Sequence, residues 1–421
     1  MQDGLTGSGR GTGPKSGGMS SFLRAIFGIF GGSKNRRPPV QPLSREELIE
    51  ALILKAESED AESRFLRERL DQVLAYMEEG NWDELSELLS EWDMEGEVSP
   101  TGIRLAQMAL DQIWTGKAFN LHDPLTPTPK ITTDLQGQLA HEIEEAHQKR
   151  PEDYVVSSLL ARLNLGRAWN SREMADGTVQ PTDTDSDMAM AFATAADAIA
   201  PFDPVKLMSP MVARLRYQYL MGRGGDQSAL TDAFDTLVSL DVGNLDTYRS
   251  HGGHILASAN GDHIALEEHA REVLARTEME IGAAAYAAMY QIPLQYNAKA
   301  LMSLDFDLFE AGLQEIIALA SDDQYTVNRI SNDLMTLAYL PFDNSVGEQA
   351  AFEHRKGEVR TILKSIIEDH MKVLLPYLWE CDEATARERI SALFADDIRA
   401  GKRIVIGTAD GNETGSFNIA A

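Results

Sequence analysis

Apolar residues recur at spacings of three and four along most of the chain after position 42, which predicts a succession of amphipathic helices. The segment 61–79 shows this pattern clearly and is followed by Gly80, a residue type that commonly ends helices. The apolar face of the segment comprises Phe65, Leu66, Leu70, Val73, Leu74 and Met77. We therefore expect a fold that is helical almost throughout.

An earlier helix is predicted by the sequence Ser-Arg-Glu-Glu at positions 44–47. This is a capping box, in which the serine hydroxyl accepts an early amide N–H of the helix and the last glutamate reaches back to the serine amide. Leu48, Leu52 and either Lys55 or Ala56 would then lie on one helix face. We expect this helix to continue as far as these last two residues.

Two interruptions divide the helical pattern. The stretch 119–130 contains three prolines and must form a loop, and the long polar stretch 174–187 separates the chain into two halves. The sequence thus predicts four parts. They are a flexible Gly-rich basic tail (1–42), an N-terminal helical domain (43–174), a helical-repeat region (185–400) and a C-terminal extension (401–421).

The third part contains an internal repeat. Gly-Asp-Gln-Ser-Ala-Leu at 225–230 recurs as Gly-Asp-His-Ile-Ala-Leu at 261–266, a period of 36 residues, and helical spacing continues after each copy. In such a turn the glycine adopts the left-handed conformation that ends one helix, and the aspartate caps the next. The four turn residues are Gly225, Asp226, Gly261 and Asp262.

One pair of helices cannot bury its apolar faces alone, so neighbouring pairs must stack. The repeat therefore predicts an all-α fold, an irregular α-solenoid of helical hairpins. A non-repetitive helical bundle with two similar turns is the alternative.

The Gly-Asp-x-x-Ala-Leu turns resemble tetratricopeptide-type units, although the tryptophan and tyrosine positions usual in the first helix of such units are poorly kept. The segment 163–172, with Ala-Trp-Asn-Ser-Arg at its end, is loosely similar to a bacterial family of unknown function that has an Ala-Trp-x-x-Arg segment before tetratricopeptide-like helices. These resemblances imply a helical-repeat fold and protein binding, and they imply no catalytic residue.

The composition narrows the class of partner. The 421 residues include 38 Lys and Arg against 66 Asp and Glu, a formal net charge of −28. This charge disfavours nucleic-acid binding, which needs cationic surface to neutralise phosphates, and favours a basic protein or peptide. Cys381 is the only cysteine, so the sequence excludes internal disulfides and multi-cysteine metal sites and fits a reducing compartment such as the cytoplasm.

The basic tail contains one amphipathic stretch, Phe22–Phe30, whose large apolar residues fall on one side. As a helix it would extend about 13 Å, far less than the roughly 30 Å hydrocarbon core of a bilayer, so it cannot span a membrane. One interpretation is a weak peripheral anchor at the inner membrane, helped by Lys34, Arg36 and Arg37. A disordered tail and a segment that packs on its own domain are the alternatives.

Nine histidines invite a search for metal ligands. A helix would place His251 and His254 on one face, and His263 follows nearby. The two glycines at 252–253 disfavour a helix, and close packing between helices is the better explanation for them. A metal-dependent enzyme with a site of histidines and carboxylates at 251–269 is therefore the alternative to a function that needs no cofactor.

Other catalytic motifs are absent from the sequence, including a phosphate-binding P-loop, a Gly-x-Ser-x-Gly elbow and a dinucleotide-binding glycine motif. Aromatic residues could instead line a groove that grips a peptide. Tyr286 and Tyr290, four apart, can share a helix face, whereas Tyr217 and Tyr219, two apart, cannot, so at most one of the latter pair faces the groove. Ordinary packing between helices is the alternative for all of them.

The C-terminal extension has the pattern of a short β-hairpin. The stretch 403–407 is β-prone, Asp410-Gly411 is a turn signal, and 415–419 could return as the partner strand. A lone hairpin is marginal in water, so it must dock or stay mobile.

The predicted function is that of a non-enzymatic scaffold or adaptor. An acidic helical-repeat surface would bind a partner protein or peptide, one of basic character, through a preformed groove. An assembly component whose acidic surface packs against copies of itself is a further alternative, and the sequence does not fix the oligomeric state.

Overall fold

The computed structural model describes residues 42–115, 133–170, 186–224, 226–257, 262–342, 347–379, 381–407 and 418–420. Within these residues the protein is mostly helical, with nineteen α-helices, a short 3-10 helix and one small β-sheet. The predicted basic tail, including Phe22–Phe30, lies outside the described residues except for its last position. None of the described helices combines the length and the apolarity needed to cross a bilayer.

The first half of the chain builds one end of the molecule. Its helices are α3 (Ala61–Glu78), α4 (Trp82–Met94), α5 (Leu105–Thr115), α6 (Thr133–Lys149), α7 (Tyr154–Asn170) and α8 (Ser186–Ile199). Their apolar side chains form one core, to which α10 (Pro210–Arg223) adds Met211 and Leu215. The helix predicted at 61–79 is confirmed as α3, and Gly80 after it has the positive φ of 70° that glycine adopts without strain.

The next helices fill the middle of the molecule and share a second core. They are α11 (Gln227–Leu240), α12 (Leu245–Ala257), α13 (His263–Ile281), α14 (Ala284–Tyr296), α15 (Ala300–Ser303), α16 (Phe306–Leu319), α17 (Gln324–Ala338) and α18 (Gln349–His370). The short helix α9 (Pro204–Leu207) contacts α10 and contributes no residue to this core. Helices close in the chain contact one another: α10 with α11, α12 with α13 and α14, α14 with α16, and α17 with α18.

Two glycines allow close approach between these helices. A Cβ atom at Gly252 in α12 would lie 1.9 Å from the carbonyl oxygen of Met289 in α14, and one at Gly312 in α16 would lie 2.3 Å from the carbonyl oxygen of Ala283. No side chain fits at either position without moving backbone. The explanation of Gly252 as a helix-packing residue is therefore confirmed.

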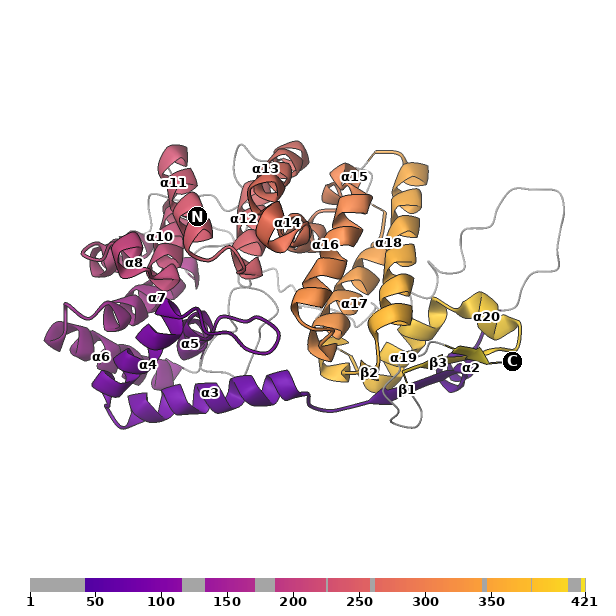
Figure 1. Ribbon diagram of the computed structural model, residues 1–421, viewed down its shortest axis with the longest axis horizontal. Coiled ribbons are helices and arrows are strands. Elements are labelled where there is room, and N and C mark those ends of the chain that lie inside the picture. Colours follow the sequence, from indigo (N-terminus) through magenta and orange to yellow (C-terminus); the bar gives the residue numbers. More distant parts are fainter. Residues whose placement is uncertain are drawn as a thin grey trace, which may run out of the picture.

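A sheet at one end of the elongated body corrects the prediction of an all-α fold (Figure 1). Its order is β2-β1-β3-β4, with β1 (Leu52–Ala56), β2 (Val373–Leu374), β3 (Arg403–Ile406) and β4 (Asn418–Ala420). β1 runs parallel to β2 and β3, and β3 pairs antiparallel with β4. The predicted pairing of two C-terminal strands is thus confirmed by β3 and β4, and the predicted turn between them lies outside the described residues. The pair docks on β1 through β3.

The helix predicted from the capping box is shorter than expected. It begins as predicted with α2 (Arg45–Ala51), because Ser44 Oγ accepts a hydrogen bond from the amide of Glu47 at 3.1 Å and Glu47 Oε2 accepts one from the amide of Ser44 at 2.7 Å. The expectation that it continues to Ala56 is wrong, since the chain becomes strand β1 at Leu52.

Long-range partners explain this difference. Leu52 and Leu54 are buried, whereas Ile53 between them is 40% exposed, which is the alternation of a strand with one face on the core. The backbone pairs with strands about 320 to 350 positions later in the chain, for example Leu52 with Ile404. Tertiary pairing therefore overrides the helical continuation at these residues.

The remaining elements cover the sheet and connect the two ends. α19 (Glu383–Ala392) lies beside β1 and α20 (Ala395–Arg399) beside β3, and η2 (Pro376–Trp379) contacts α17 and α19. After β1 the chain enters α3, which runs along the lower edge of the body toward the opposite end (Figure 1). The described N-terminal and C-terminal segments therefore lie together at the sheet.

Candidate functional site

A pocket opens where the two cores meet, between α5, α7 and α10. It holds about 440 Å³ of empty space, counting the part that is open to solvent. Apolar contacts of α5 and α10 with α7 hold the three helices together around it. The polar side chains of its lining include Asp93, Arg104, Asp111, Arg162, Arg214, Gln218 and Asp241.

Asp111, in the lining of this pocket, pairs with two arginines. Its Oδ1 accepts a hydrogen bond from Arg162 Nε at 2.7 Å, and its Oδ2 accepts one from Arg214 Nη1 at 3.1 Å. Burial alone would raise the pKa of this carboxyl, but the two guanidinium charges outweigh burial and lower it. Asp111 is therefore ionised, and it is held between α7 and α10.

Both guanidinium groups keep donors that the protein does not use. An arginine carries five N–H donors, yet Arg162 bonds only through Nε and Arg214 only through Nη1 within the described part of the chain. The side chains are 16% and 10% exposed. No nitrogen of Arg162 or Arg214 is both buried and without a hydrogen-bond partner. The unused donors of the two side chains therefore reach solvent through the pocket. The pocket thus presents two preformed cationic groups.

Gln218 adds an uncharged group to the same wall. It lies four residues after Arg214 on α10, so the two side chains share a helix face. It is half-buried and lines the pocket, and its amide makes no hydrogen bond to any described residue. The wall from α10 therefore offers a guanidinium and an amide one helical turn apart.

A second ion pair closes one side of the pocket. Arg104 Nε donates to both carboxylate oxygens of Asp241 at 3.0 and 2.8 Å, and Arg104 Nη1 donates to the carbonyl oxygen of Gly96 at 2.7 Å. Asp241 is the C-cap of α11, and its side chain is 4% exposed. This arginine, unlike the other two, is committed to the protein, and it ties the start of α5 to the end of α11.

Asp93 lies on the remaining side, between α4 and the start of α10. It accepts hydrogen bonds from the amide of Met211 at 2.8 Å and from the hydroxyl of Ser209. Burial raises the pKa of Asp93 to about 6, and these two hydrogen bonds offset only part of that effect. The group therefore takes up a proton well above the pH at which an ordinary aspartate does.

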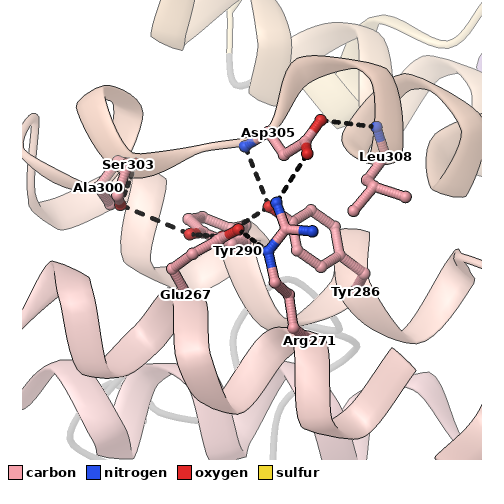
Figure 2. A network of polar contacts seen from close by, with 8 residues as sticks. All are labelled: Glu267, Arg271, Tyr286, Tyr290, Ala300, Ser303, Asp305 and Leu308. Carbon is pink, nitrogen blue, oxygen red and sulfur yellow. Dashed lines mark hydrogen bonds and ion pairs between the residues drawn. The ribbon is translucent and has the colours of Figure 1, made fainter. Parts of the chain in front are cut away.

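The predicted partner-binding tyrosines lie elsewhere. Figure 2 shows the hydroxyls of Tyr286 and Tyr290 directed at one carboxylate oxygen of Glu267 on α13, at 2.7 and 2.6 Å. Arg271 links this carboxylate to Asp305, with bonds of 2.6 and 2.7 Å. Burial raises the pKa of both tyrosines, and the bonds to the carboxylate raise it further.

Both side chains, Tyr286 and Tyr290, are fully buried at 0% exposure. They share a helix face, as the spacing predicts, but that face is turned into the core and not toward a groove. The structure therefore places them in the packing between helices, where they join α13 and α14 to the start of α16.

The two tyrosines of the other predicted pair, Tyr217 and Tyr219, differ in their burial. Tyr217 is 1% exposed, and its hydroxyl lies 2.5 Å from Nδ1 of His251. Tyr219 is half-buried and accepts a hydrogen bond from Arg223 at 2.6 Å. Tyr217 is thus almost completely buried, whereas Tyr219 keeps part of its surface exposed, so Tyr217 does not line a groove.

The candidate metal ligands do not form a ligand set. His251 is buried against the ring of Phe234, with ring centroids 3.8 Å apart, and burial first, then the neighbouring His269 and His254, lower its pKa. His263 begins α13. Among the described residues, no group of three or more His, Cys, Asp or Glu side chains is arranged to hold a metal ion. The histidine most central to the alternative function is instead part of the core.

The turn residues of the repeat are partly described. Asp226 accepts the amides of Ser228 and Ala229 at 2.9 and 3.4 Å, and Asp262 accepts those of Ile264 and Ala265, both at 2.9 Å. Each is therefore the N-cap of the following helix. Gly225 and Gly261 lie outside the described residues.

No local sequence pattern indicates the pocket, because its residues have no common spacing. Asp111, Arg162 and Arg214 lie about fifty residues apart on three helices, so no local motif joins them. One signal was present, since Arg214 interrupts the apolar run Met-Val-Ala-Arg-Leu in α10 and a charged residue in such a run needs a buried partner.

Comparison with known proteins yields no match to a protein-family model, to a curated protein or to a solved structure.

Proposed function

We propose that the protein is a non-enzymatic scaffold or adaptor, which binds a partner protein or peptide through a surface built by successive helix pairs. The observation that carries this proposal is the contact of helices that are close in the chain, α10 with α11, α12 with α13 and α14, α14 with α16, and α17 with α18. The rings of Tyr217 and Phe234 against His251 join the first of these pairs to α12. In the proposal these pairs are irregular tetratricopeptide-like hairpins that form an α-solenoid. Such an array offers an extended preformed surface, which is the usual binding device of repeat proteins.

Recurring turn chemistry supports the repeat interpretation. Asp226, Asp262 and Asp305 each cap the second helix of a proposed pair, and the third accepts the amide of Leu308 at 3.3 Å. A cap of this kind fixes where each helix begins, so successive pairs can keep a similar geometry. The glycine contacts of α12 with α14 and of α14 with α16 bring these helices close together.

Charge supports a basic partner. At a net charge of −28 the protein attracts cationic proteins over long range, which speeds encounter more than it strengthens the final complex. The pocket between α5, α7 and α10 then supplies local specificity. In this proposal the protein is cytoplasmic, and the basic tail with Phe22–Phe30 provides at most weak peripheral contact with the inner membrane.

The test is capture of partners by the affinity-tagged full chain, with the same chain lacking residues 1–40 as a matched form. A partner that is identified by mass spectrometry is then purified and titrated against the protein by calorimetry. We expect one-to-one or other fixed stoichiometry, with binding weakened as ionic strength rises. The failure of every captured protein to bind after purification would refute the scaffold.

Metal analysis of untagged protein tests the alternative enzyme. One tightly bound metal ion per chain would favour that alternative over the scaffold, because the proposal assigns no metal. Measurement of the mass in solution tests the self-assembling alternative, since a scaffold for another protein needs no defined homo-oligomer.

A further inference from the structure

The pocket between α5, α7 and α10 has unused binding capacity of one chemical kind. We propose that it binds a carboxylate group of a ligand, held by the guanidinium groups of Arg162 and Arg214 and by the amide of Gln218. This inference rests on the proposed function, because it names the group by which the protein recognises what it binds.

The donors of the pocket match a planar anion. The guanidinium groups of Arg162 and Arg214 are already fixed by their bonds to Asp111, at 2.7 and 3.1 Å, so a ligand need not order them. Their remaining N–H groups form planar forks, a geometry that pairs with the two oxygens of a carboxylate. The amide of Gln218 supplies a further donor from the next turn of α10.

Local charge favours a single negative charge. Arg104 is paired with Asp241, and Arg249 farther along is paired with Asp246. Asp111 is the described carboxylate in direct contact with Arg162 and Arg214, whereas Asp246 feels the charge of Arg214 without an ion pair to it, so the direct pairs hold one positive charge in excess. A carboxylate balances that excess, whereas a doubly charged phosphate would overbalance it close to Asp241.

Burial strengthens this preference. The side chain of Arg214 is 10% exposed and that of Arg162 is 16% exposed, so a bound anion would lie in a medium where charged contacts are stronger than in water. The remaining carboxylate of the lining, Asp93, is bound to Ser209 and Met211 at the start of α10. It therefore does not take the place of the ligand.

The test is a titration of the full chain with ¹³C-labelled acetate at constant ionic strength and near-neutral pH. Binding is measured by the broadening of the acetate NMR line. So small a ligand should bind saturably in about the millimolar range. Arg162→Gln removes one charged donor group and leaves Asp111 paired with Arg214. We expect acetate affinity to fall at least about tenfold in this variant.

A second variant keeps both arginines. Gln218→Glu places a carboxylate of the protein itself in the pocket, where it should compete with acetate and lower its affinity by about tenfold or more. The matched control is Arg167→Gln on the same helix α7, since Arg167 is 42% exposed and pairs with Glu144 outside the pocket. Its acetate affinity should equal that of the wild type. Circular dichroism checks the folding of each variant.

Further ligands separate the sources of the carboxylate. N-acetylglycine presents the carboxylate of a chain terminus, and N-acetylglycinamide is the same molecule with that charge removed. Stronger binding of N-acetylglycine than of acetate would assign the pocket to a peptide terminus. Equal binding of the two would assign the pocket to a small acid or a side chain. The amide should not bind. Phosphate that binds as tightly as acetate or more tightly would overturn the carboxylate assignment.

Two results would overturn the pocket altogether, namely no saturable binding of acetate to the wild type, and equal affinity in the wild type and both pocket variants. These outcomes are distinct from failure of the scaffold. Loss of the acetate site with a purified protein partner still bound would remove this inference alone, whereas intact acetate binding without any protein partner would remove the scaffold alone.

Discussion

Replacing Gly252 by alanine measures how much the close contact between α12 and α14 matters. In the native structure a Cβ atom at this position would lie 1.9 Å from the carbonyl oxygen of Met289 and 2.7 Å from its carbonyl carbon. Non-bonded carbon and oxygen atoms need more than 3 Å, so the two helices must separate by about 1 Å or distort. The clashing atoms belong to backbone, and no side-chain rotation relieves the clash.

The expected loss of stability follows from two opposing terms. Overpacking of a well-packed core costs about 1–3 kcal/mol, and a clash with backbone lies at the upper end of that range. The higher helix propensity of alanine returns about 1 kcal/mol within α12. We therefore expect Gly252→Ala to lower the free energy of unfolding by about 2 kcal/mol, a decrease of several degrees in the unfolding temperature.

Gly357→Ala is the matched control. Gly357 lies inside α18, where an added Cβ atom has no neighbour within 4 Å, so only the propensity term remains. This variant should be more stable than the wild type by about 0.5–1 kcal/mol. Thermal unfolding followed by circular dichroism compares the three proteins. Equal stabilisation by both substitutions would show that α12 and α14 do not approach as closely as described.

Two further predictions concern Asp93 in the lining of the pocket and strand β1 of the sheet. Because the pKa of Asp93 is raised from 3.8 to about 6 by burial, the folded state holds the proton more tightly, and its contribution to stability is lost as pH rises through about 6. Asp93→Asn should remove this loss. Between pH 4 and pH 7 the free energy of unfolding of the variant, measured by urea unfolding, should therefore rise by up to about 3 kcal/mol relative to that of the wild type. A stability difference between the two proteins that does not change with pH would contradict the raised pKa. Leu54→Asp places a charge on the buried face of β1 and should release residues 44–57 to proteolysis, whereas Ile53→Asp on the exposed face should not; equal protection of both variants would contradict the register of the strand.

Local signals predicted the helices and their caps. A period near 3.6 identifies α3 within a single stretch of chain, and the aspartates at 226 and 262 bond to amides two and three residues away. Such features need no knowledge of the rest of the fold. The same holds for the start of α2, where the two capping hydrogen bonds lie within four residues.

Features that depend on distant partners were missed. The sequence Leu-Ile-Leu-Lys-Ala at 52–56 follows a strong helix start, and it forms a strand only because the chain after residue 372 supplies both neighbours. Tyr286 and Tyr290 illustrate a related limit. Their spacing predicts a shared face, and their rings are 5.3 Å apart, but the spacing does not tell whether that face meets solvent or the core.

The residues that form the pocket also join the two cores. Asp111 connects α5 to both α7 and α10, and the pair of Arg104 with Asp241 connects the same segment to the end of α11. Partly buried ion pairs of this kind often add little to stability compared with apolar packing, but they demand defined geometry. The orientation of the cores and the shape of the pocket are therefore fixed together. A change at Asp111 must disturb both, whereas a change at Gln218, which bonds to no described residue, can alter ligand binding without breaking either ion pair.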